Sequence, residues 1–220
     1  MPKVTSVEHQ KKNPHRFNIF LDGQFAFGAD EDLIVDYCLL RGKTISQENL
    51  NKLLFEAEAG KLIDRVYNLY SIRERSEKEI RDYFKLLSFK NKIKGKEKIS
   101  PEIVDLVVEK LRRKGVINDL RFAKAWVESR RKSKQKGMMA IKAELYQKGI
   151  DREIVEEVVG GQSAAGSEEE LAKQALEKKL KSWKNTDKPT LYKKAIEFLL
   201  RRGFEYGVAK SVVGERLKST

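Results

Sequence analysis

Hydrophobic and polar residues follow two different periods along the chain. Two runs of strand-forming residues, Arg16–Leu21 and Gln24–Gly28, flank the pair Asp22-Gly23. Asp-Gly between two such runs is a strong hairpin signal, because both central residues of the tight turn need a positive φ. Val4–Glu8 is a candidate third strand. From Asp30 onward the hydrophobic residues recur at helical spacing, so the pattern predicts a small β-hairpin module followed by helices.

Capping residues mark where the helices begin and end. The apolar run that starts after Asp30 stops at Gly42, and Ser46 can cap a helix that continues to about residue 69. Ser76 and Glu79 form a capping box for the next helix. From this capping box onward, the expected helices are Ser76–Leu87, Ser100–Leu111, Leu120–Arg131, Met138–Gln147, Arg152–Val159, Glu168–Trp183, Leu191–Arg202 and Val208–Leu217.

Two of the connections are long. Ser88–Ile99 carries a lysine at every second position from Lys90 to Lys98 and is expected to be a solvated loop. Gly160–Gly166 is small and polar, which is typical of a mobile linker.

A short motif recurs at three helix ends. It consists of Leu, two variable residues, a basic residue, Gly and an apolar residue, at Leu111–Val116, Leu145–Ile150 and Leu199–Phe204. The cation favours the negative end of the helix dipole, and the glycine takes the left-handed conformation that ends a helix. Repeats tens of residues apart indicate stacked helical units.

Charge is unevenly distributed along the 220 residues. The formal net charge is +13, with 46 Lys and Arg against 33 Asp and Glu, and the excess lies entirely after residue 60. This asymmetry indicates an anionic partner, which could be nucleic acid, an acidic protein face or a membrane surface. The alternative is that Lys- and Glu-rich helices are simply well solvated.

Several classes are disfavoured by composition. Four prolines and fourteen glycines are too few for an all-β sandwich, and no apolar run approaches the length of a transmembrane helix. The N-terminus lacks an apolar signal core, and one cysteine, Cys38, cannot form an internal disulfide, so we expect a cytoplasmic protein. Cys38 lies in an apolar helical run and is expected to be buried.

Motifs of catalysis are also missing. The chain has two histidines and no phosphate-binding loop, dinucleotide fingerprint or zinc-protease motif. The acidic clusters Asp30–Asp32 and Glu168–Glu170 are better explained as helix starts than as metal sites. Trp126 and Trp183 occupy apolar helical positions typical of a core. We therefore expect no enzymatic activity, no cofactor and no metal.

The helix–Gly–helix turns also suggest a helix-turn-helix DNA reader. A recognition helix should present Arg, Asn, Gln or Lys at its start. The helix after Gly149 instead presents Asp151, Glu153 and Glu156, and the basic residues precede the glycines. A regulator that binds duplex DNA directly therefore remains only an alternative.

The order and spacing of these segments resemble the RecX family, the bacterial modulators of the RecA recombinase. The segments that carry the resemblance are Phe25–Gly28 in the hairpin, Leu69–Ile80 (Leu-Tyr-Ser-Ile-Arg-Glu-Arg-Ser-Glu-Lys-Glu-Ile), Gly115–Arg130, Gly137–Ile150 and Arg201–Phe204. The resemblance covers about residues 16 to 217. It implies a mainly α fold: tandem three-helix, helix-turn-helix-like repeats in an elongated array, with a small N-terminal β-hairpin module.

The resemblance also implies how the chain is divided. The expected parts are a hairpin module with joining helices at 1–60 and helical units at 61–117, 118–160 and 161–220. Gly115 then joins the first unit to the second, and the lysine-rich segment 88–99 becomes the internal turn of the first unit.

The implied function is modulation of RecA. Members of the family bind in the groove of the RecA–single-stranded DNA filament and usually inhibit it, with roles in homologous recombination, DNA repair and the SOS response. We expect a monomer with no membrane partner that binds single-stranded DNA alone weakly and without sequence preference. Arginine binds carboxylate and phosphate with two parallel hydrogen bonds, so the expected contacts are mostly arginines. They are Arg73, Arg75, Arg112, Arg113, Arg130, Arg131, Lys132, Arg201 and Arg202.

Overall fold

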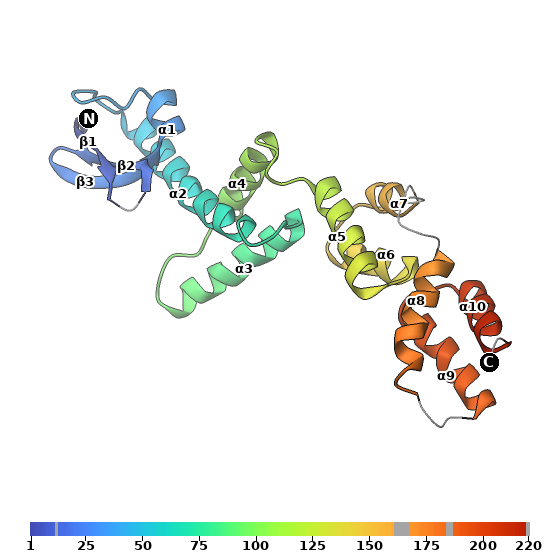
Figure 1. The fold of residues 1–220 in the computed structure, drawn as a ribbon. Coiled ribbons are helices and arrows are strands. Elements are labelled where there is room, and N and C mark those ends of the chain that lie inside the picture. Colours follow the sequence, from blue (N-terminus) through green and yellow to red (C-terminus); the bar gives the residue numbers. More distant parts are fainter. Residues whose placement is uncertain (12, 161–167, 184–186, 219–220) are drawn as a thin grey trace. The chain divides into compact units, whose positions relative to one another are not determined.

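A computed structural model describes the whole chain except residues 12, 161–167, 184–186 and 219–220. The predicted linker Gly160–Gly166 lies almost entirely outside the described residues. The elements in chain order are β1 Val4–Gln10, β2 Asn13–Leu21, β3 Gln24–Asp30, α1 Glu31–Asp36, α2 Gln47–Tyr70, α3 Glu77–Ile93, α4 Pro101–Arg113, α5 Asp119–Lys134, α6 Met138–Gln147, α7 Arg152–Gly160, α8 Glu168–Leu180, α9 Lys188–Arg201 and α10 Tyr206–Lys218 (Figure 1).

The chain forms two compact units. The first contains Met1–Glu74 and Ile80–Ile117, and the second contains Arg75–Glu79 and Asn118–Thr220. The first turn of α3 thus belongs to the second unit.

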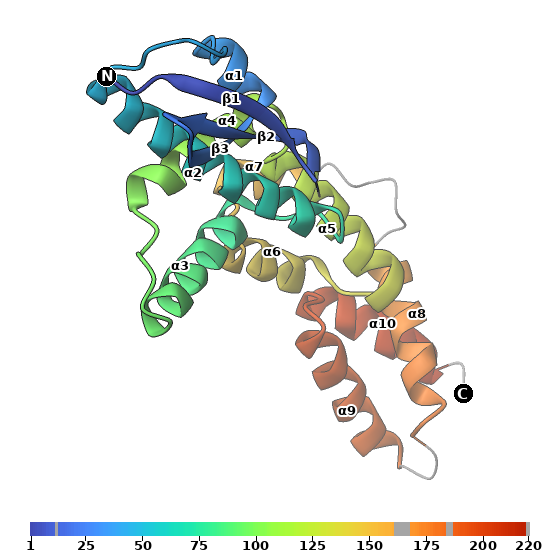
Figure 2. The same cartoon turned by 90° about the vertical axis from the view of Figure 1, so that its left-hand side faces the viewer.

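The N-terminal strands form the predicted hairpin with the third strand added. The sheet is antiparallel in the order β1-β2-β3, and Leu21 pairs with Gln24 across the two-residue turn. Asp22 and Gly23 have φ values of 48° and 83°, as the Asp-Gly pair requires. Helix α2 runs beneath the sheet, and α1 lies at its end (Figure 2).

Helix α1 is shorter than predicted, and the expected burial of Cys38 is wrong. The helix ends at Asp36, and Cys38 is exposed with a φ of 44°. The Leu39 amide then donates to the Ile34 carbonyl at 2.9 Å, so that Leu39 turns inward and is fully buried. This is the hydrogen bond of a Schellman helix end, with cysteine in the left-handed position that glycine usually takes.

The lysine-rich connection is also shorter than predicted. Helix α3 continues to Ile93, so Lys90 and Lys92 are helical and only residues 94–100 form the loop. Lysine and asparagine allow a helix to continue, so nothing in this stretch stops it before Gly95, whose φ is 66°. The Ile99 amide donates to the Ser88 hydroxyl at 3.1 Å and holds the two ends of the loop together.

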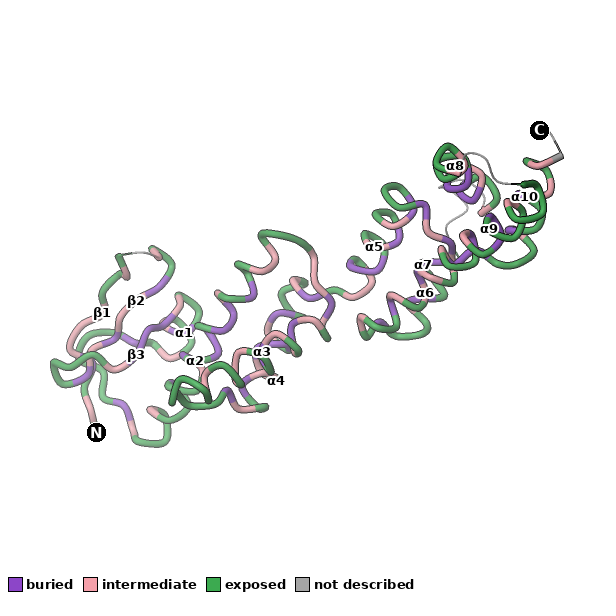
Figure 3. The backbone as a smooth tube through the Cα atoms, turned by 90° about the horizontal axis from the view of Figure 1, so that it is seen from below, coloured by how far each residue is buried: buried purple, intermediate pink, exposed green. Residues whose placement is uncertain are grey.

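The described residues form four separate hydrophobic cores. One contains the sheet, α1 and the start of α2, and each of the other three lies among three consecutive helices. Buried positions recur along each helix and alternate with exposed ones, as the helical period predicts (Figure 3). The three helical groups are α2–α4, α5–α7 and α8–α10, which we call the first, second and third repeats.

In the second unit, the turn after α9 packs against the start of α6 through main-chain atoms. The amides of Gly137 and Met139 donate to the carbonyls of Arg202 and Gly203, at 2.9 and 3.0 Å. The amide of Met138 donates to the carboxylate of Glu168 at 3.3 Å. The first residue of α8 therefore caps the N-terminus of α6.

The turn after α6 meets the first turn of α3 at a similar joint, in which a side-chain hydroxyl takes the place of a main-chain amide. The Ser76 hydroxyl donates to the carbonyl of Lys148 at 2.8 Å, and the Glu77 amide donates to the carboxylate of Asp119 at 2.9 Å. Asp119 is the first residue of α5, as Glu168 is of α8. A similar joint therefore occurs twice within the second unit.

Replacing Gly203 by Ala tests the closeness of the joint. Gly203 has a φ of 88°, and a Cβ there would lie 2.3 Å from the Ala140 backbone nitrogen. Gly115 has a similar φ of 65° but has open space around it. We expect Gly115→Ala to cost about 1 kcal/mol from backbone strain alone, and Gly203→Ala to cost at least about 2 kcal/mol more.

Hydrogen exchange of the helix before each glycine, α4 or α9, would measure these losses. Equal losses in the two variants would contradict the steric role of Gly203.

Candidate anion-binding groove

The end of α5 is organised around one carboxylate, that of Glu144. Its Oε2 accepts hydrogen bonds from Trp126 Nε1 at 2.8 Å and Arg130 Nε at 2.7 Å, and its Oε1 accepts one from Lys136. The Arg130 guanidinium also lies 3.9 Å above the centre of the Trp126 ring. Trp126 stacks on Phe122, so one end of the cluster continues into the core, as predicted for this tryptophan.

Two buried groups complete the turn that follows α5. Arg131 is only 4% exposed, and its Nη2 lies 3.5 Å from Glu168 Oε1. Burial raises the pKa of Glu168, and the Met138 amide and the Arg131 charge offset this only in part. Gln135 caps α5 in the left-handed conformation and accepts a hydrogen bond from Lys178 Nζ at 3.2 Å.

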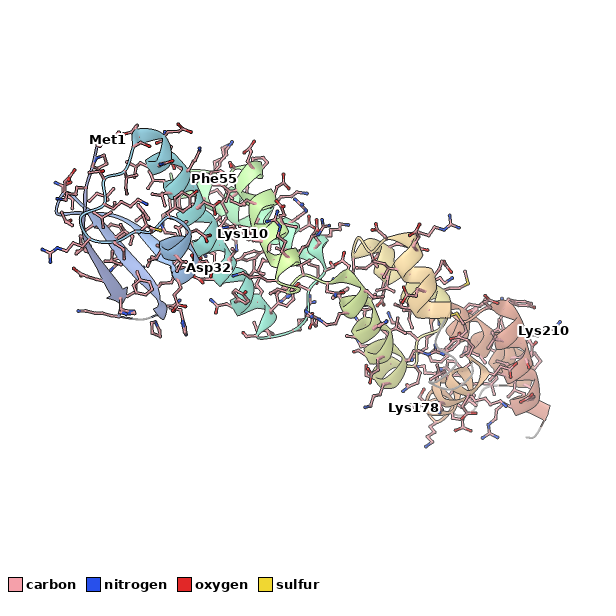
Figure 4. All side chains as sticks on the ribbon, turned by 90° about the horizontal axis from the view of Figure 1, so that it is seen from above. Met1, Asp32, Phe55, Lys110, Lys178 and Lys210 are labelled. Carbon is pink, nitrogen blue, oxygen red and sulfur yellow. The ribbon has the colours of Figure 1, made fainter. Side chains whose placement is uncertain are left out.

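A cationic groove opens beside this turn, between the second and third repeats. Its volume is about 450 Å³. The joint at Gly203 places the end of α5 next to the end of α9, and Lys178 reaches the groove from α8, where Figure 4 labels it. The lining residues are Ser133, Lys134, Gln135, Lys136, Lys178, Arg201 and Arg202.

The cations of the groove differ in their partners. Lys136 is bound to Glu144, and Arg202 donates to the carbonyl of Lys134 and lies over the Phe198 ring. Lys134 and Arg201 are exposed and have no carboxylate within ion-pair distance among the residues that the structure describes. The groove can therefore bind an anion at these two positions, with the other cations adding to the local potential.

The expected contact residues fall into three sets. Arg201 and Arg202 line the groove, and Lys132 is exposed next to Ser133, which also lines it. Arg130 is half-buried by Glu144 and Trp126, and Arg131 is buried against Glu168. Arg131 therefore does not fit the expectation of a surface contact, because its side chain is buried and lies beside Glu168 of the same chain.

The remaining expected contacts lie outside the groove. Arg73 and Arg112 are exposed, and Arg113 is exposed beside Glu109 on the same helix. Arg75 is half-buried. The groove does not bring any of these four together with Arg201.

The sequence did not single out all the groove residues. Lys134 and Lys136 belong to a dense basic run, Arg130–Lys136, which can be recognised in the sequence. Lys178 lies on a helix with several lysines, and nothing in the sequence marked it. In the described part of the chain, no cluster of His, Cys, Asp and Glu could hold a metal ion. None of the described helices is long and apolar enough to cross a bilayer.

A three-stranded module and three-helix repeats define a helical-repeat protein with a small N-terminal sheet. Three family models match the chain: the regulatory protein RecX N-terminal domain at residues 2–46, the RecX second three-helix domain at 118–159 and the RecX third three-helix domain at 167–213. Two relatives called regulatory protein RecX are similar over most of their length. That of Listeria monocytogenes serovar 1/2a is 33% identical over 97% of this chain and 75% of its own, and that of Bacillus subtilis is 32% identical over 98% and 77%. The chain belongs to the RecX family, which confirms the resemblance.

Two solved structures share the fold. A crystal structure of regulatory protein RecX has a TM-score of 0.76 at 23% identity, over 96% of this chain and 98% of that one. RecX from Lactobacillus salivarius has a TM-score of 0.58 at 23% identity, over 71% of this chain and 95% of that one. The predicted fold class, a mainly helical chain of tandem three-helix units with a small N-terminal sheet, is thus confirmed.

Glu144→Gln tests the carboxylate at the centre of the cluster. Burial alone would raise the pKa of Glu144, but the three hydrogen bonds to it hold the pKa below its ordinary value of 4.5. A lowered folded-state pKa means that the carboxylate stabilises the fold above the unfolded-state value, and that this is lost as pH falls through the folded-state value. We expect Glu144→Gln to be less stable than the parent at about pH 7, with the difference shrinking toward about pH 3.

Urea unfolding followed by tryptophan fluorescence at both pH values would measure this. Glu153→Gln, at an exposed carboxylate of α7, is the matched control. A pH-independent difference for Glu144→Gln would contradict the proposed role of its charge.

Proposed function

We propose that this protein regulates RecA without catalysing a reaction, by binding in the groove of the RecA–single-stranded DNA filament and inhibiting it. Membership of the RecX family supports the choice of partner. The observation that carries the mode of binding is the cationic groove, in which Lys134 and Arg201 lack a carboxylate partner in the described structure. Such a protein would act in homologous recombination and DNA repair.

The groove suits a composite partner. Arg201 can bind a phosphate or a carboxylate with two parallel hydrogen bonds, and Lys134 can act as a point charge toward either. A nucleoprotein filament presents DNA phosphates and protein carboxylates side by side. Contacts that are weak separately add when one surface engages both together.

The third helix of the second repeat, α7, gives no support to the reading of duplex sequence. In α7 the exposed side chains are mostly acidic, and Glu156 is bound to Lys142 and Tyr146. An acidic helix would be repelled from the major groove. The proposal therefore assigns DNA contact to the groove and not to α7.

Removing Lys134 and Arg201, which have no carboxylate partner among the described residues, tests the proposal most directly. We expect Lys134→Ala with Arg201→Ala to weaken binding to a RecA filament on single-stranded DNA about tenfold, because each exposed cation contributes about 0–1 kcal/mol or somewhat more at a desolvated contact. Fluorescence anisotropy of labelled filaments would measure it, with Bacillus subtilis RecA as a suitable recombinase. The parent protein should also lower the DNA-dependent ATPase rate of RecA.

The matched control is Lys188→Ala with Lys210→Ala. Both lysines are exposed on the third repeat and neither lines the groove (Figure 4 labels Lys210). Each double variant removes two positive charges, so the change in net charge is the same. Equal weakening by both double variants would remove the groove from the site. Absence of filament binding by the parent would remove the proposed function.

Binding to single-stranded DNA alone should be weak and sensitive to salt. The +13 charge attracts the backbone, and each phosphate contact releases counterions, so affinity should fall steeply between about 50 and 200 mM salt. Titration of labelled oligonucleotides of different sequence would show little preference among them. Tight, salt-insensitive binding to one duplex would instead favour the DNA-reading regulator.

A further inference from the structure

A second groove lies in the first repeat, between α3 and α4, and it is of different character. Its volume is about 520 Å³. The buried side chains of Phe84 and Ile99 and the half-buried Val104 supply apolar surface to it. Phe89 also lines the groove and is 60% exposed, so an occupant of the groove would bury its ring.

The rim of this groove is cationic. Arg81 is bound to Asp105 at 2.6 Å and Lys85 lies 3.5 Å from Asp82. Lys92 and Lys98 also line the groove, and both are exposed with no carboxylate at ion-pair distance in the described residues. An apolar centre is thus flanked by positive charge.

We propose that the groove between α3 and α4 binds an acidic peptide segment of a partner protein, with a hydrophobic side chain as its anchor. The anchor would pack on Phe89 and against the apolar lining, which removes an exposed aromatic ring from water. Carboxylates on either side of the anchor would face Lys92 and Lys98. This binding does not depend on the phosphate contacts proposed for the second unit.

Charge and polarity decide against two other occupants. Duplex DNA presents phosphates at regular spacing, but its bases are stacked inside the helix and it offers no apolar group for the centre of the groove. A second copy of this chain would bring the same cationic rim toward itself, because an isologous contact places like residues near one another. An acidic segment complements both the centre and the rim.

A synthetic peptide provides the test. The probe is a short fluorescein-labelled peptide with a Leu-Phe pair between runs of Asp and Glu, titrated with the full-length protein. We expect binding that weakens with salt and that falls about tenfold in Phe89→Ala, since a buried aromatic side chain contributes that much or more. Lys92→Glu should weaken it severalfold at low salt and less at high salt.

Matched variants separate the groove from general effects. Phe25→Ala removes an equally exposed phenylalanine from β3, and Lys96→Glu reverses a lysine of the same region that does not line the groove. Both should bind the peptide as the parent does. Because Phe89 and Lys92 are exposed, their variants should keep the parent's circular dichroism.

Several outcomes would overturn the proposal. They are peptide binding that Phe89→Ala and Lys92→Glu leave unchanged, equal binding of a peptide with Lys in place of the acidic residues, and no peptide binding at all. Single-stranded DNA binding lost in Phe89→Ala would make the groove a nucleic-acid surface. Self-association lost in Phe89→Ala would make it an interface between copies.

Discussion

The second unit depends on a contact between main-chain atoms. Gly137 and Gly203 approach so closely that a Cβ on Gly137 would lie 2.4 Å from the Gly203 carbonyl carbon. Hydrogen bonds from the amides of Gly137 and Met139 satisfy the carbonyls at the end of α9, which a helix end would otherwise leave to water. The amides at the start of α6 and the carbonyls at the end of α9 therefore satisfy each other's hydrogen bonds.

The cationic groove is a consequence of that contact. Lys134 and Lys136 lie at the end of the first helix of the second repeat, and Arg201 and Arg202 lie at the end of the second helix of the third repeat. Helix ends attract basic residues because of the dipole, and the joint brings two such ends together. A preference that is local in each helix thus becomes a collective positive potential where the helices meet.

Most helix starts could be predicted because their determinants are local. Ser46, Ser100 and Asp187 accept hydrogen bonds from amides three residues on, and Asp187 shows that such a cap can also precede the expected start. The end of α1 could not be predicted in the same way. Cys38 takes a left-handed conformation because burial of Leu39 outweighs the modest strain of a side chain there.

The site was predictable only in part, for a different reason. The basic run at the end of α5 was visible, but Arg130, Arg131 and Lys132 look alike in the sequence. Their environments differ because successive helical residues point in directions about 100° apart, toward Glu144, Glu168 and solvent respectively. Which arginine is interior depends on an acidic residue more than thirty positions away.

The repeated joint has an evolutionary consequence. Each joint requires only a few specific groups. They are a glycine after one helix, a small residue whose amide or hydroxyl donates to the preceding carbonyl, and an acidic residue that caps the helix start. Ser76 and Gly137 occupy the same place in the two joints, and so do Asp119 and Glu168. Residues elsewhere on each repeat can therefore diverge without disturbing the assembly. Tandem duplication of a gene segment that encodes one such unit would therefore yield a longer array, because each new repeat already carries the groups that form the joint.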